Sequence, residues 1–171
     1  MSYNIHPIVV HFPIALLFLY SVLKIIPFKK WFSNVSWKHI ERVLLLVGVL
    51  GTFAALMTGE IAEELVRPNH DLLDAHSLFA TIATYTYALL LLGEILSISM
   101  LWIDSKLKSG RILKTIVFIK NLLNQPVLST TLAILGLITI SITGLLGGVM
   151  VYGTSADPVA GVVLKLLGIN L

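Results

Sequence analysis

The stretch HPIVVHFPIALLFLYSVLKII, residues 6–26, decides the class of fold. Apolar side chains fill it from Ile8 onward, without the period-two alternation of a half-buried strand. A helix of about 20 apolar residues crosses the hydrocarbon core of a bilayer. The apolar run stops at Pro27, and two lysines, Lys29 and Lys30, follow it. We therefore predict a membrane-spanning helix over about residues 8–26.

The composition of the whole chain supports a membrane protein. Of the 171 residues, 57% are hydrophobic and 12% are charged, whereas soluble domains carry about 25% charged residues. In so apolar a chain, the small excess of Lys and Arg is expected to set topology, and we predict no nucleic-acid partner. The chain has no cysteine, which excludes disulfides, thiolate metal sites and the CxxCH attachment of c-type haem.

Three further apolar runs are long enough to span a bilayer. They cover about residues 40–58, 75–103 and 127–152. The sequence thus predicts an all-α fold, a four-helix transmembrane bundle with up-down topology that forms a single domain over residues 1–171.

Two other segments are expected to lie along the membrane surface. Residues 111–125 mix spaced cations with apolar side chains, as an interfacial helix does. The apolar tail, residues 158–171, carries one lysine and is expected to lie on the outer leaflet or against a partner subunit.

The basic residues predict the orientation of the bundle. Ten of the twelve Lys and Arg residues fall in or beside two loops: Lys24, Lys29, Lys30, Lys38 and Arg42 in the first, and Lys106, Lys108, Arg111, Lys114 and Lys120 in the second. Only Arg67 and Lys165 lie on the other side. The positive-inside rule places both basic loops in the cytoplasm, and both termini outside.

Four of the five histidines then fall at the outer end of the bundle: His6, His11, His70 and His76, whereas His39 lies at the other end. The members of each neighbouring pair are five or six residues apart, about 140° or 240° around a helix, so a site on one helix is excluded. Ligation would join the first and third spans, which are diagonal in such a bundle.

This arrangement suits haem b held by two imidazoles. His11 and His76 lie just inside their apolar runs, and we predict that they are the axial ligands. His6 and His70 lie nearer the water, where they would either ligate a second haem or be solvated. The alternatives for the deeper pair are another metal or structural hydrogen bonds.

The acidic segment TGEIAEE, residues 58–64, is expected beside the histidines. Glu60 and Glu64 are one helical turn apart, and Glu63 is three residues from Glu60. As an alternative to haem, Glu60 and Glu64 would form a Zn, Cu or Mn site with the histidines. They would otherwise orient the imidazoles, lie near haem propionates with Arg67 as counter-ion, or remain solvated.

Glu94 lies within the third apolar run, where an unpaired carboxylate is costly. Lys24 has a comparable depth in the first run, so we predict a structural Lys24–Glu94 ion pair. A role for Glu94 in proton uptake or quinone binding is the alternative.

Small residues also recur at four-residue spacing: Gly51, Ala55 and Gly59 in the second run, and Gly144 and Gly148 in the fourth. Such a stripe permits close helix contact, or leaves a bare face for a flat prosthetic group.

Several of these motifs resemble a bacterial membrane family, the domain-of-unknown-function family 2231. They are the opening HPIVVHFP, the TGEIAEE segment, His76, and GGVMVY at residues 147–152. The resemblance covers most of the chain and implies a four-helix membrane domain, often near cytochromes, in which haem binding is plausible. It adds weight to His6, His11, Glu60 and His76. The stretch GTSADP after Tyr152 departs from the glycine- and valine-rich ending expected of the family.

The sequence thus favours a membrane subunit that resembles a b-type cytochrome, an electron-transfer protein rather than a stand-alone enzyme. It would relay electrons between quinol, or a partner redox subunit, and an external acceptor. A metal-binding transporter or enzyme and a structural subunit of a larger complex are the alternatives. The expected partners are the lipid bilayer of the bacterial inner membrane and other subunits of a redox complex or copies of this chain.

Overall fold

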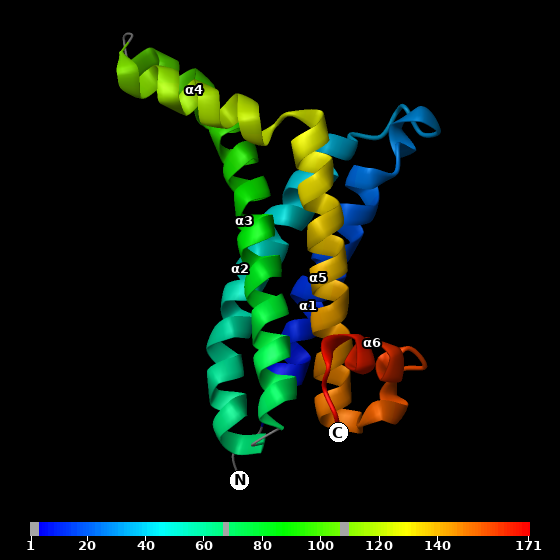
Figure 1. Cartoon of the computed structure of the whole chain (residues 1–171). Helices are drawn as coiled ribbons and strands as arrows, with labels where there is room; N and C mark the ends of the chain where they lie inside the picture. Colours follow the sequence, from blue (N-terminus) through cyan, green and yellow to red (C-terminus); the bar gives the residue numbers. More distant parts are fainter. Residues whose placement is uncertain (1–3, 67–68, 107–109) are drawn as a thin grey trace.

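The computed structural model describes residues 4–66, 69–106 and 110–171, and it is all-helical there (Figure 1). The elements in chain order are α1 (His6–Ile25), η1 (Phe28–Lys30), α2 (Trp37–Val66), α3 (His70–Lys106), α4 (Arg111–Leu123), α5 (Pro126–Tyr152), η2 (Thr154–Ala156) and α6 (Ala160–Leu167). Arg67, the expected counter-ion, falls outside the described residues.

Four of these helices, α1, α2, α3 and α5, are long and apolar enough to cross a membrane. The four predicted spans are therefore confirmed as helices. Two of them are longer than predicted: α2 ends at residue 66 instead of 58, and α3 begins at residue 70 instead of 75. The TGEIAEE segment is thus the last part of α2 rather than a link, because Glu and Ala favour helix even where hydropathy falls.

The helices pack in the cyclic order α1, α2, α3, α5, so α1 and α3 are diagonal, as predicted. The end of the bundle that carries η1 and α4 is called the basic end here. The opposite end, where α1 and α3 begin at His6 and His70, is called the histidine end (Figure 1).

The core between the four helices lies mainly in the middle of the bundle. It contains Leu17 and Tyr20 of α1, Leu45 and Val49 of α2, and Tyr87 of α3. These side chains bridge helices that are distant in sequence, and their burial adds the dispersion contacts that hold spanning helices together in lipid.

Glycines on α2 let α1 approach closely. A Cβ atom at Gly51 would lie 3.1 Å from the Cβ of Pro13, and one at Gly48 would lie 2.5 Å from a methyl carbon of Leu17. Pro13 sits inside α1, where it removes one backbone hydrogen bond. Part of the small-residue stripe is therefore a helix contact, the first of the two roles that its spacing allowed.

The surface segments are helical too. Residues 111–125 contain α4, which runs from the basic end at an angle to the bundle (Figure 1). The tail contains α6, whose Ala160 and Leu164 are buried in a cluster with Leu72 of α3 and Leu146 of α5. One face of the tail thus packs against the bundle of its own chain. The sequence had suggested that the tail lies on the outer leaflet or against a partner subunit. The short loop after Tyr152 turns the chain back and brings this face into contact.

Candidate functional site

His6 is half-buried at the first residue of α1, and its ring is held by α2. Its Nδ1 lies 3.0 Å from Thr58 Oγ1. The Thr58 hydroxyl donates its one hydrogen to the carbonyls of Ala54 and Ala55, at 3.0 and 3.1 Å. The Thr58 oxygen is therefore the acceptor for His6 Nδ1–H. In the neutral imidazole this leaves the lone pair on Nε2.

His76 is half-buried on α3 and is oriented in the same way by α5. Its Nδ1 lies 3.0 Å from the backbone carbonyl of Thr143. A carbonyl only accepts, so Nδ1 carries the proton and Nε2 again holds the lone pair. Imidazoles that ligate metals are usually oriented by such an Nδ1–H bond to a backbone carbonyl or another acceptor.

Both rings belong to the histidine end of the bundle, on the diagonal helices α1 and α3. A glycine flanks each ring. A Cβ atom at Gly59 of α2 would lie 3.3 Å from His6 Cε1, and one at Gly147 of α5 would lie 3.3 Å from His76 Cε1. Each of the four spanning helices therefore contributes to this site, either an imidazole or a bare backbone face. We call these four residues, His6, Gly59, His76 and Gly147, the paired-histidine site.

His11 does not take the inward position that the sequence suggested. Its side chain is exposed on α1, and its Nδ1 bonds to the backbone carbonyl of Pro7 one turn earlier. His6 lies seven residues, about two helical turns, before the buried Pro13, and therefore on the face of α1 that packs against α2. His11, five residues further, is then about 140° away around the helix.

His70 is exposed at the first residue of α3, as the solvated alternative expected. The TGEIAEE carboxylates Glu60, Glu63 and Glu64 are also exposed, on the last turns of α2. Among the residues that the structure describes, no three His, Asp or Glu side chains are placed to hold a metal ion together. The structure therefore lends no geometric support to Glu60 and Glu64 as ligands of Zn, Cu or Mn.

The ion pair of Glu94 differs from the expected one. Its Oε2 accepts a hydrogen bond from Nε of Arg42 at 2.8 Å, so α2, and not Lys24 of α1, provides the partner. The cyclic order of the helices makes α2 a neighbour of α3 and leaves α1 diagonal to it. Lys24 instead lines a cavity at the basic end.

The tyrosines of the spanning helices α3 and α5 differ in the face on which they lie. Tyr85 and Tyr152 are exposed on the outside of the bundle, whereas Tyr87 is fully buried. Sequence reasoning missed Thr58 and Thr143, the two partners that orient the imidazoles. The only signal was their position, since each directly precedes a glycine, at Gly59 and Gly144.

Residues 2–157 match the model of a family described as "Predicted membrane protein (DUF2231)". The chain belongs to this family. The match covers α1 to α5 and ends before α6. It confirms the family suggested by the motifs and the membrane class of the protein. No curated protein and no solved structure shows significant similarity to the chain.

Proposed function

We propose that this DUF2231 member is a b-type cytochrome-like electron-transfer subunit and that it holds haem b through His6 and His76. The observation that supports this proposal is that both imidazoles have the same hydrogen-bonded tautomer. The two lie on diagonal helices at one end of the bundle, each Nδ1–H is engaged by a protein acceptor, and each Nε2 keeps its lone pair. Bis-histidine ligation of haem in a helical bundle needs this arrangement.

The residues around the rings make room for the imidazoles. Gly59 and Gly147 let the two rings lie directly against the backbone of α2 and α5. Thr58 and Thr143 fix the ring orientation, so the imidazoles need little reordering on ligation. When bound, haem would supply one-electron redox chemistry, and axial ligands and burial would set its potential. This assignment replaces His11 with His6 as the partner of His76.

We infer the orientation of the chain in the membrane from the positions of its basic residues. We propose that the chain spans the bacterial inner membrane with its basic end in the cytoplasm and both termini outside. The paired-histidine site would then lie near the outer face. It would exchange electrons between quinol, or a redox subunit beside it, and an external acceptor.

An optical spectrum of the detergent-purified protein, expressed with adequate haem supply, tests the proposal. We expect a Soret band and a sharp α band on reduction. His6→Ala and His76→Ala should each abolish or strongly shift both bands, whereas His39→Ala, at the basic end, should leave them unchanged.

His11→Ala separates the two ligand assignments. If its spectrum is unchanged, His6 keeps its role; if the band is lost in His11→Ala and retained in His6→Ala, the proposed pair is wrong. A protein without a Soret band, with or without a stoichiometric metal by elemental analysis, contradicts the haem proposal.

A further inference from the structure

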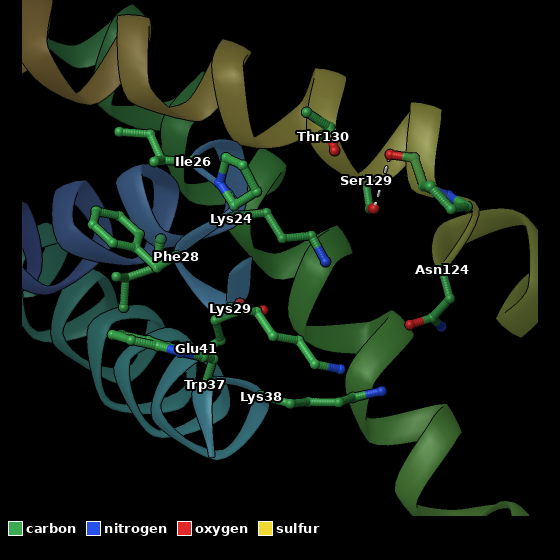
Figure 2. Close-up of a pocket in the computed structure, with 13 residues that line it drawn as sticks. Lys24, Ile26, Phe28, Lys29, Trp37, Lys38, Glu41, Asn124, Ser129 and Thr130 are labelled. Carbon is green, nitrogen blue, oxygen red and sulfur yellow. Dashed lines mark hydrogen bonds between the residues drawn. The ribbon is translucent and has the colours of Figure 1, made fainter. Parts of the chain in front are cut away.

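A cavity of about 340 Å³ lies at the basic end, far from the paired-histidine site (Figure 2). It is bounded by the end of α1, the start of α2 and the junction between α4 and α5. Leu23, Phe28 and Trp37 give it an apolar part. Asn124 and Ser129 line it on the side of the α4–α5 junction.

Three lysines share this cavity. Lys24 comes from the last turn of α1, Lys29 from η1 and Lys38 from the first turn of α2. Figure 2 shows their side chains extending in the same direction, toward the side where Asn124 lies. Within the described part of the chain, none of the three ammonium groups is in an ion pair, since the pair found there joins Arg42 and Glu94.

Among the residues that the structure describes, Glu41 is the one carboxylate that lines the cavity. With three ammonium groups and one carboxylate, the lining carries a formal charge of +2. Like charges gathered at a membrane boundary repel one another, and an anion among them offsets that repulsion.

We propose that this cavity binds the phosphate-bearing headgroup of an anionic phospholipid. The lysines would hold the phosphate. The apolar part, at the ends of membrane-spanning helices, would contact the glycerol and the upper acyl chains. This apolar part favours a lipid over free phosphate, because free phosphate gains nothing from it. The proposal does not depend on haem binding.

Native mass spectrometry of delipidated protein in detergent tests this inference, with phosphatidylglycerol, phosphatidylcholine and inorganic phosphate as probes. We expect phosphatidylglycerol to bind the wild-type protein at least about fivefold more tightly than phosphatidylcholine. Lys24→Gln and Lys38→Gln should each weaken its binding by about fivefold, the effect of one lysine near an anionic lipid.

Lys114→Gln is the matched control, because Lys114 is an exposed lysine of α4 that does not line the cavity. It should leave binding unchanged. Glu41→Gln removes the opposing charge and should tighten binding by about fivefold, an effect that a merely structural Glu41 would not produce.

Three results would overturn the proposal: equal binding of phosphatidylcholine, equal loss in Lys114→Gln, or unchanged or tighter binding in Lys24→Gln. Displacement of phosphatidylglycerol by millimolar inorganic phosphate would assign the cavity to free phosphate instead of lipid. If Lys24→Gln does not fold, the comparison of the two lipids on wild-type protein and on Lys29→Gln, at an exposed position, decides the question.

Discussion

Tyr87 lies fully buried between three helices of the bundle. Its hydroxyl lies 2.8 Å from Ser21 Oγ and 3.3 Å from the Leu17 carbonyl, both on α1. Its ring meets Gly136 of α5, where a Cβ atom would come within 2.7 Å of Tyr87 Cζ. One side chain thus joins α3 to the diagonal helix α1, and this is possible because the position facing it on α5 has no side chain.

Gly136→Ala should therefore destabilise the protein by about 1–3 kcal/mol, the usual cost of overpacking a filled core. The added methyl group must displace a ring that is enclosed on all sides. Reversible unfolding in mixed micelles of increasing SDS fraction, followed by circular dichroism, measures the change.

Gly161→Ala is the control for that measurement, because nothing lies within 4 Å of a Cβ atom built at Gly161 in α6. It should be neutral or stabilise the helix by up to about 1 kcal/mol. Equal destabilisation by both substitutions would show that the contact of Gly136 with Tyr87 is not the cause.

At the candidate site, the sequence singled out the histidines, but the structure turns His6 inward together with His76, where the sequence favoured His11. It placed four histidines at one end of the bundle and indicated ligation between diagonal helices. His76 faces the interior, as predicted. His6, and not His11, lies on the packed face of α1, because contacts such as Pro13 against Gly51 of α2 fix the rotation of α1, and hydropathy does not.

At the scale of the helices, the contacts between neighbouring helices depend on glycines and on the ion pair of Arg42 with Glu94. Gly48 and Gly51 let α2 lie directly against α1. Arg42 and Glu94 join α2 to α3 near the basic end, with side-chain exposures of 32% and 14%. A partly buried carboxylate in an apolar span needs such a partner, since an unpaired charge there is costly.

A double-mutant cycle with Arg42→Gln and Glu94→Gln should give a coupling energy of about 1–2 kcal/mol, the range found for paired groups in contact. Each single substitution should destabilise the protein, and the second should cost less once the first is present. SDS unfolding again gives the free energies.

Lys24→Gln combined with Glu94→Gln tests the pair that the sequence suggested. These two effects should simply add. A coupling larger than that of Arg42 with Glu94 would make Lys24 the true partner and contradict the observed geometry.

At the scale of the whole molecule, the cations concentrate at one end of the bundle and the histidines at the other (Figure 1). Cysteine labelling tests the orientation proposed from this asymmetry, and the natural chain has no cysteine to interfere. Ser36→Cys and Ser155→Cys place single thiols at exposed positions of opposite ends. In intact cells, a membrane-impermeant maleimide should label only Ser155→Cys, and permeabilisation should expose Ser36→Cys. The reverse pattern would place the basic end outside, against the positive-inside rule.

The sequence by itself determined the class of the molecule, because the length and hydropathy of a spanning helix are local properties. From it came the four spans, the family, and the side of the bundle on which His6, His70 and His76 lie. The tertiary structure alone decided which imidazole faces inward, which cation meets Glu94, and where three lysines converge on a cavity. These outcomes depend on helix rotation and on which helices are neighbours. Both are fixed by side-chain packing between segments distant in sequence, such as Tyr87 against Gly136 or Pro13 against Gly51.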